Sequence, residues 1–235
     1  MFESFMNLIY PRYCTLCHRH GSYLCDVCKK SFKCNLPECY VCRRLSPGYA
    51  THTQCESNHS LDHVFVAWEY NQFSSRILKL LKYKGVTDTS QLLNDLIIGR
   101  ILACGYNRCL ERSLMLPVPI SSTRKAKRGF NQSEIIAKAL VKKFNCDLSL
   151  DLIGAKNTNY HMAGQKKEER QQKIGNPFYM KNSLDLSNYT SITIVDDVIT
   201  TGKTLENVAQ VLRENYSVDL QLNAICLFRG RPYYL

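Results

Sequence analysis

The chain has 235 residues, of which 45% are hydrophobic and 22% are charged. This composition excludes a wholly disordered chain and a multi-span membrane protein, and no run approaches the ~18 apolar residues that a membrane helix needs. Basic residues outnumber acidic ones by 31 to 20, and residues 121–181 alone hold thirteen basic and five acidic residues. Such a segment is either a plain solvated surface or a site for phosphates, carried by a nucleic acid or by a small substrate.

The first fourteen residues do not have the pattern of a secretion signal. They lack a basic leader, contain Glu3, and their short apolar stretch ends at Pro11. The apolar side chains favour a short helix docked on the core over a membrane-surface anchor. We therefore expect a cytoplasmic, reducing location without membrane insertion.

Cysteines are concentrated near the N-terminus, with eight of the twelve between positions 14 and 55. Four pairs of ligand-type residues share a gap of two residues, which lets both side chains of a pair bind one tetrahedral ion. In a reducing compartment this repeat favours metal sites over disulfides. We predict two zinc sites, formed by Cys14, Cys17, Cys25 and Cys28 and by Cys39, Cys42, His52 and Cys55.

The pairing of these ligands leaves two alternatives open. A crossed arrangement would use the same residues, and His18, His20 and His59 are near enough to compete as ligands, with His59 the main rival of His52. Four protein ligands leave no position for a catalytic water, so the expected role is structural. We expect residues 1–60 to form a double zinc-ribbon domain that folds only with metal, and residues 61–235 to form a second domain.

Strand and helix patterns alternate after the cysteines. An apolar, β-favouring run predicts a strand over His63–Tyr70, and apolar spacing predicts a helix over Ser74–Tyr83. Ser90 is a suitable N-cap for a second helix. A short buried strand follows over Leu114–Pro119, and then a helix over Ser133–Phe144. The expected core faces of the last two helices are Leu92, Leu93, Leu96, Ile97 and Ile101, and Ile135, Ile136, Ala139 and Leu140.

Residues 155–178 are polar, charged and almost without periodicity, which indicates either disorder or a functional lid. Beyond them we predict a strand over Ser191–Val195, a helix over Leu205–Glu214 and a strand over Leu220–Phe228. Apolar strands that alternate with helices predict an α/β fold. Its sheet is expected to be mostly parallel and covered by helices on both faces.

The segment 191–204 (SITIVDDVITTGKT) carries the strongest chemical signal. Asp196 and Asp197 are expected at the carboxyl end of a buried strand, where open α/β sheets bind ligands. A Thr/Gly-rich turn follows and leads into a helix, whose N-terminus offers amides and hydroxyls to a phosphate. The two carboxylates suit ribose hydroxyls or Mg²⁺. A Walker A loop is excluded, because Asp197 lies where that motif requires glycine.

These motifs together resemble a known family. The Asp-Asp-Val-Ile-Thr-Thr-Gly run resembles the phosphoribosyl pyrophosphate (PRPP) fingerprint of type I phosphoribosyltransferases. With Lys82-Tyr83, Pro117-Val118-Pro119, Arg128-Gly129-Phe130-Asn131-Gln132 and the N-terminal cysteine pairs, the chain resembles the ComF/ComFC family of bacterial competence proteins. The match extends over essentially the whole chain.

The resemblance implies a phosphoribosyltransferase-type site that binds PRPP with Mg²⁺. Asp196 and Asp197 would hold the ribose hydroxyls, directly or through Mg²⁺, and Arg128 would face the pyrophosphate. The lid would bring Lys166, Lys167 and Arg170 to the ligand. The other implied binding residues are Ser121, Arg124, Asn131, Gln132, Val198, Ile199, Thr200, Thr201, Gly202, Lys203 and Thr204. Gly154 occupies a position where the family usually has arginine.

Two classes of function stay open at this point. The first is an enzyme that transfers the phosphoribosyl group to an unidentified acceptor and releases pyrophosphate. The second is a non-catalytic protein of DNA uptake that binds single-stranded DNA through its zinc module and basic segment, or serves as a scaffold. The family resemblance also implies a helicase or translocase partner of the uptake machinery.

Overall fold

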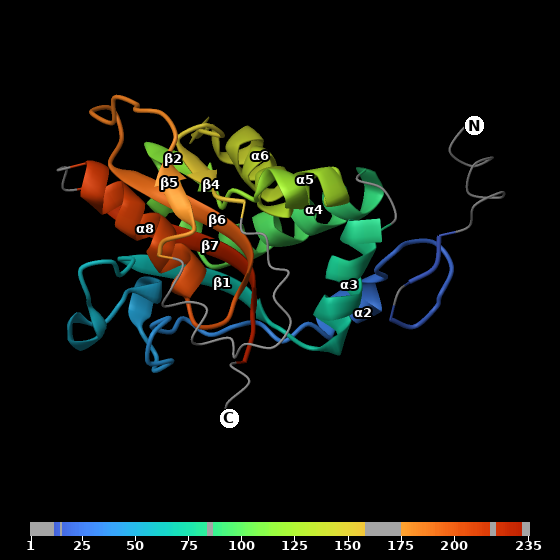
Figure 1. Cartoon of the computed structure of the whole chain (residues 1–235). Helices are drawn as coiled ribbons and strands as arrows, with labels where there is room; N and C mark the ends of the chain where they lie inside the picture. The colour runs from blue at the N-terminus through green and yellow to red at the C-terminus, as the bar shows by residue number, and fades with distance from the viewer. Residues whose placement is uncertain (1–11, 15, 84–86, 158–174, 217–219, 232–235) are drawn as a thin grey trace, which may run out of the picture.

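A computed structural model describes residues 12–14, 16–83, 87–157, 175–216 and 220–231 (Figure 1). Its centre is a five-stranded sheet in the order β1-β7-β6-β2-β3, in which every neighbouring pair is parallel. The strands are β1 (His63–Glu69), β2 (Ser113–Pro117), β3 (Asp147–Leu148), β6 (Ser191–Ile199) and β7 (Gln221–Arg229). The predicted α/β fold with a mostly parallel sheet flanked by helices is confirmed.

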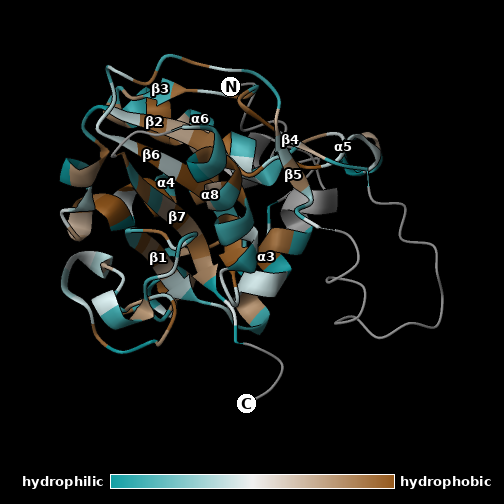
Figure 2. Cartoon of the chain, turned by 60° about the vertical axis from the view of Figure 1, so that its left-hand side comes forward, coloured by the Kyte–Doolittle hydropathy of each residue, from teal (hydrophilic) through white to brown (hydrophobic). Residues whose placement is uncertain are grey.

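Helices cover both faces of this sheet. Figure 1 shows α8 (Lys203–Asn215) on one side and α4 (Thr87–Ala103) and α6 (Gln132–Phe144) on the other. The described part of the chain therefore has two hydrophobic cores, one on each face of the sheet, and Figure 2 shows the hydrophobic residues concentrated in the strands between them. In the middle of the strands the two cores use alternate residues, as a parallel sheet buried on both faces requires: β7 gives Ile225 and Leu227 to the first core and Ala224 and Cys226 to the second.

Each core is formed by the apolar side of a helix against the strands. On the first face, Ile97 and Leu140 pack with Phe65 of β1. On the second face, Leu205 and Val208 of α8 pack with Ile194 of β6. The remaining helices of the body are α3 (Gln72–Tyr83), α5 (Ser122–Arg128) and the short 3-10 turn η3 (Tyr106–Leu110). None of the helices in the described ranges is long and apolar enough to cross a membrane.

Several predicted boundaries differ from the structure. α4 begins at Thr87, so Ser90 lies inside the helix and is not its N-cap. The buried face of α6 includes Ala137, whereas Ile135 and Ala139 are only half-buried, and the helix begins one residue earlier than predicted, at Gln132. The strand predicted to end at Val195 continues to Ile199.

A small antiparallel hairpin flanks the predicted lid. It pairs β4 (Ile153–Ala155) with β5 (Phe178–Met180), and neither strand was predicted. The described residues of the lid segment are 155–157 and 175–178. The three predicted lid residues, Lys166, Lys167 and Arg170, lie outside the described residues.

The cysteine-rich segment packs along the β1 edge of the sheet. It contains helix α2 (Asp26–Lys30) and the 3-10 turns η1 (Pro47–Tyr49) and η2 (Thr53–Cys55). The amide of Asn35 donates to the carbonyl of Ala67 at 3.1 Å, and the amide of Thr51 donates to Asp62 at 2.8 Å. The segment is therefore tied to both ends of β1 by backbone hydrogen bonds.

Candidate functional site

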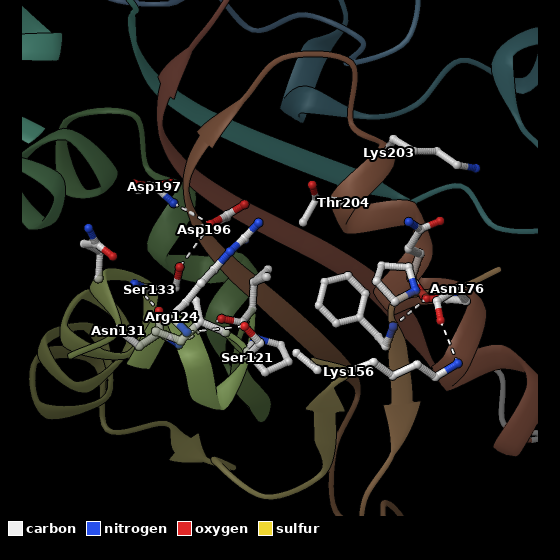
Figure 3. Close-up of a pocket in the computed structure, with 18 of the residues that line it drawn as sticks. Ser121, Arg124, Asn131, Ser133, Lys156, Asn176, Asp196, Asp197, Lys203 and Thr204 are labelled. Atoms are coloured by element: carbon white, nitrogen blue, oxygen red, sulfur yellow. Dashed lines mark hydrogen bonds between the residues drawn. The ribbon is translucent and has the colours of Figure 1, made fainter. Parts of the chain in front are cut away.

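A cavity of about 750 Å³ opens at the carboxyl ends of β2 and β6. In Figure 3, Ser121, Arg124 and Asp196 lie on one side of it and Lys156 and Asn176 on the other. The sequence-predicted residues that line the cavity are Ser121, Arg124, Arg128, Asn131, Gln132, Asp196, Asp197, Val198, Lys203 and Thr204. Residues from distant parts of the chain, all assigned to one site from their motifs, therefore meet in one place.

The unequal length of the strands creates this opening. β2 pairs with β6 only as far as Pro117 and Val195, whereas β6 continues along β7 until Ile199 lies beside Arg229. Asp196 and Asp197 therefore belong to the strand and are held by β7, although sequence analysis placed them just beyond the strand. Because β2 has ended, the two acidic residues can reach the cavity.

Asp196 is the most perturbed group in the cavity. One of its carboxylate oxygens accepts hydrogen bonds from Ser133 Oγ at 3.0 Å and from the amide of Asp197 at 2.9 Å. Burial and the negative charge of Asp197 raise the pKa of Asp196 to about 8, and the two hydrogen bonds oppose this rise. A cation between these carboxylates would relieve their repulsion, and carboxylate oxygen is the donor that Mg²⁺ prefers. The acidic pair therefore fits Mg²⁺.

Helix α5 brings positive charge to the same cavity. Ser121 caps the helix by accepting from the amide of Arg124, and Gly129 ends it in the left-handed conformation at φ 79°. Arg124 and Arg128, four residues apart, share one face of the helix and both line the cavity. Arginine is well suited to bind phosphate because its guanidinium donates two parallel hydrogen bonds.

The loop after α5 is fixed by Asn131. Its Nδ2 donates to the carbonyl of Val118 at 2.9 Å, and its Oδ1 accepts from the amide of Ser133 at 3.2 Å. The neighbouring Gln132 is 4% exposed and lines the cavity, and its Nε2 has no hydrogen-bond partner among the described residues. Asn131 therefore positions the loop, whereas Gln132 retains a donor for a bound ligand.

The opposite wall contains residues that sequence reasoning missed. Lys156 Nζ donates to the carbonyl of Asn176 at 2.9 Å, and Asn176 Nδ2 donates to the carbonyl of Asn207 at 2.7 Å. These bonds attach the hairpin to α8 and bring a basic side chain to this wall of the cavity, where Asn207 and Gln210 also lie. On α8, Asn207 and Gln210 follow Thr204 at helical spacing, which is the sequence signal that could have identified them.

The predicted phosphate-binding run divides into two parts. Lys203 and Thr204, at the start of α8, line the cavity. The four residues before them do not line it: Ile199, Thr200, Thr201 and Gly202. Ile199 is buried in the core, and Gly202 is the N-cap of α8 in the left-handed conformation at φ 89°. These four residues, hereafter the phosphate turn after the sequence prediction, lead directly into the first turn of α8, which lines the cavity.

The position of Gly154 is closed to a larger side chain. A Cβ atom there would lie 2.4 Å from the ring of Tyr179, which is opposite Gly154 in the β4–β5 hairpin. An arginine at this position would need Tyr179 to move. Lys156, two residues further along, supplies a positive charge on this wall.

The two predicted cysteine tetrads are each assembled in space. Within each tetrad the ligand atoms lie within 4.8 Å of one another, and the pairing follows the chain without crossing. His52 takes part in the second tetrad, with Nδ1 at 3.3 Å from Cys42 Sγ, and His59 does not. Sulfur and imidazole ligands in sets of four match tetrahedral zinc.

The surroundings of the second tetrad also suit a metal. His52 Nε2 lies 3.2 Å from the carbonyl of Leu45, and a proton on that nitrogen leaves Nδ1 free to bind an ion. The Arg44 guanidinium lowers the pKa of the Cys42 thiol to about 6, which favours the thiolate form that binds metal. The residues present therefore fit zinc as a structural ion.

Comparison with known proteins gives a consistent set of relatives, although no family model matches the chain. The chain is 26% identical over 199 residues to competence protein F of Haemophilus influenzae, which covers 81% of this chain and 84% of that protein. It is 23% identical over 215 residues to competence protein ComFC of Streptococcus pneumoniae, with 88% of each chain covered. It is 22% identical over 228 residues to DNA utilization protein YhgH of Escherichia coli, covering 93% of this chain and 98% of that protein.

Proposed function

Since these relatives support the ComF family indicated by the motifs, we propose that the chain is a DNA-uptake protein whose cavity binds PRPP together with Mg²⁺. The observation that carries the proposal is the meeting of Asp196 and Asp197 with Arg124 and Arg128 around one cavity. A small molecule that carries both hydroxyl groups and phosphates is complementary to a cavity with carboxylates and arginines. The role in DNA uptake is supported by the relatives, which are named competence proteins and DNA utilization proteins.

The charges of the cavity match the two ends of PRPP. The diphosphate would lie near Arg124 and Arg128 of α5, and the ribose hydroxyls near the acidic pair. The 5′-phosphate would meet Lys203 and Thr204 at the N-terminus of α8, where backbone amides and the helix dipole favour an anion. The free donor of Gln132 would bind a ligand oxygen.

The same site is suited to transfer of the phosphoribosyl group. In that reaction the bond from the anomeric carbon to the diphosphate oxygen breaks, and the diphosphate leaves with the electron pair. An acceptor then forms the new bond to that carbon. Arg124 and Arg128 would neutralise the charge that develops on the leaving group, and bound Mg²⁺ would supply a further divalent charge. The acidic pair would hold the sugar in place as positive charge develops on its ring.

The binding proposal is tested by calorimetric titration of PRPP with Mg²⁺ into the zinc-loaded protein. We expect saturable binding that the Asp196→Asn/Asp197→Asn variant abolishes without unfolding the protein. Asp185→Asn is a matched control, because this exposed carboxylate lies outside the cavity lining. Absence of binding to the wild type at millimolar PRPP, or full affinity in the double variant, would overturn the proposal.

A second candidate function is binding of single-stranded DNA without catalysis. Helix α5 favours it, since Lys125 is exposed next to Arg124, which lines the cavity, and the surrounding segment is strongly basic. Such binding should weaken steeply as salt increases, because counterions are released from the DNA phosphates. DNA affinity that does not change between low and high salt would count against this candidate.

A further inference from the structure

We propose that Tyr40 and Arg43 are positioning residues of the phosphate turn, and that the second metal site keeps them in place. The proposal rests on the function proposed above, because that function gives a phosphate-binding role to the N-terminus of α8, which directly follows the turn. Both residues belong to the knuckle, the tight turn formed by residues 39–44 around the first two ligands of the second tetrad. Tyr40 lies between Cys39 and Cys42, and Arg43 follows Cys42 directly.

The backbone of the knuckle is defined by two hydrogen bonds. The amide of Arg43 donates to the carbonyl of Cys39, and the amide of Cys39 donates to the carbonyl of Arg44, both at 2.9 Å. Arg43 itself has the left-handed conformation at φ 62°. A tetrahedral ion bound to Cys39 and Cys42 would fix this shape, and with it the directions of the Tyr40 and Arg43 side chains.

Tyr40 packs directly on the end of the phosphate turn. It is 2% exposed, and its hydroxyl donates to Glu206 Oε1 in the first turn of α8 at 3.1 Å, although the two residues are 166 positions apart. Its ring atoms lie 2.8 Å and 2.9 Å from the point where a Cβ of Gly202 would stand. Tyr40 therefore holds both the N-cap and the first turn of the helix whose N-terminus faces the cavity.

Arg43 holds the middle of the turn through backbone carbonyls. Its guanidinium lies 3.5 Å from the carbonyl oxygen of Thr200 and 3.2 Å from that of Gly230. The amide of Gly230 donates to the carbonyl of Ile199 at 2.7 Å, so the same contacts attach the turn to the end of β7. In a trans peptide the C=O and N–H bonds point in opposite directions. Because Arg43 holds the Thr200 carbonyl on the knuckle side, the amide of Thr201 is turned away from the knuckle.

The first metal site offers an internal comparison. Its knuckle has the same backbone pattern: the amide of His18 donates to the carbonyl of Cys14 at 2.8 Å, and His18 has φ 58°. However, this site packs with Leu24 and Phe32 in the core on the face covered by α4 and α6, whereas Tyr40 belongs to the core on the face covered by α8. Two similar knuckles are therefore placed differently relative to the phosphate turn.

The experiment compares Arg43→Ala with His18→Ala in the full-length, zinc-loaded chain. Both substitutions truncate a side chain at the same position of a knuckle and in the same backbone conformation. The first readout is hydrogen exchange at the amides of residues 199–206 without ligand, and the second is the affinity for PRPP with Mg²⁺. For Arg43→Ala we expect exchange to become about tenfold faster and affinity about tenfold weaker, as loss of one or two hydrogen bonds predicts. Arg43→Lys should restore part of the affinity, and zinc content should stay at the wild-type level.

The hydrogen-exchange results distinguish positioning of the turn by Arg43 from a general effect of substitution in a knuckle. Unchanged exchange at residues 199–206 in Arg43→Ala would overturn it, as would an equal effect of His18→Ala. Faster exchange confined to Arg43→Ala would support positioning even if the wild type bound no PRPP, and that result would overturn only the proposed ligand. Tyr40→Phe provides a second variant that keeps the ring against Gly202 and removes the hydroxyl, which donates to Glu206 and accepts from the amide of Leu61. We expect about threefold faster exchange in the first turn of α8.

Discussion

Ser133 Oγ donates a hydrogen bond to a carboxylate oxygen of Asp196 at 3.0 Å. This hydrogen bond joins the first turn of α6 to strand β6. The bond opposes the rise in the pKa of Asp196 that burial and Asp197 cause. Ser133 is itself held by Asn131, whose Oδ1 accepts from its amide. The loop that follows the arginine-bearing helix α5 is thus attached, through Asn131 and Ser133, to the carboxylate of Asp196.

Ser133→Ala is expected to weaken PRPP binding. Without the hydroxyl donor the carboxylate of Asp196 loses a stabilising bond, so its pKa should rise further and less of it is ionised near pH 7. We expect the dissociation constant in the presence of Mg²⁺ to increase about threefold to tenfold, measured by calorimetry. Ser133→Thr keeps a hydroxyl and serves as the control. Equal affinity of wild type and Ser133→Ala at pH 7 would contradict this role.

Asp196 should make the fold less stable as the pH rises from about 5 to about 8. Its pKa of about 8 in the folded chain exceeds the usual value of ~3.9 in an unfolded chain, so the folded state binds the extra proton across this window. The stabilisation that the folded state gains from this proton is lost as the pH approaches 8. In urea unfolding, Asp196→Asn should flatten this dependence and stabilise the protein most at the upper end of the window.

The control for the pH experiment is Asp185→Asn. The hydrogen bond from the amide of Ser187 lowers the pKa of Asp185, so its contribution is already constant above about pH 5. Its removal should leave the slope of stability against pH unchanged in the window. A wild-type unfolding free energy that rises with pH there would contradict the raised pKa of Asp196.

Arg124 and Arg128 should each contribute to binding of pyrophosphate. We expect Arg124→Gln and Arg128→Gln to weaken pyrophosphate binding in the presence of Mg²⁺ about tenfold each, because each removes a charge-assisted contact. Lys127→Gln removes the same charge from an exposed position on the same helix that does not line the cavity, and should change affinity little. Equal losses in all three variants would indicate a general effect of charge on the ligand.

The sequence predicted best what depends on local spacing. The two-residue gaps assigned both cysteine tetrads correctly, since a ligand pair and its intervening amides form a self-contained unit. The strand containing Asp196 and the helix after Gly202 were likewise evident from apolar runs and a turn signal. The end of β6 could not be predicted, because the last four residues of this strand are held only by pairing with β7.

Contacts between distant segments were beyond sequence reasoning. Nothing in the pattern around Asn176 indicates that it would bond to α8, and nothing around Tyr40 indicates a partner at Glu206. Both contacts join α8 to segments far from it in the sequence, 31 positions away for Asn176 and Asn207 and 166 positions away for Tyr40 and Glu206. Side chains that act through such contacts have ordinary local surroundings, so only the tertiary structure identifies them.

The second tetrad predicts which histidine binds metal. His52→Ala should lower the zinc content from two ions to one per chain, whereas His59→Ala should leave two, because only His52 lies within ligand distance of the cysteines. Elemental analysis of the purified variants measures the content directly. His52→Cys should restore two ions, since thiolate is an equivalent ligand. Two ions in His52→Ala would show that another group completes the site.

Gly202→Ala should destabilise the fold through two separate effects. The residue has φ 89°, where a side chain is strained, and a Cβ would lie 2.8 Å from the ring of Tyr40. We expect a loss of about 1–3 kcal/mol in the free energy of unfolding, measured by urea denaturation. Gly105→Ala isolates the first effect, because Gly105 has φ 66° but no atom within 4 Å of the added carbon. The loss at Gly202 should therefore exceed that at Gly105, and equal losses would show that Tyr40 yields to the new methyl group.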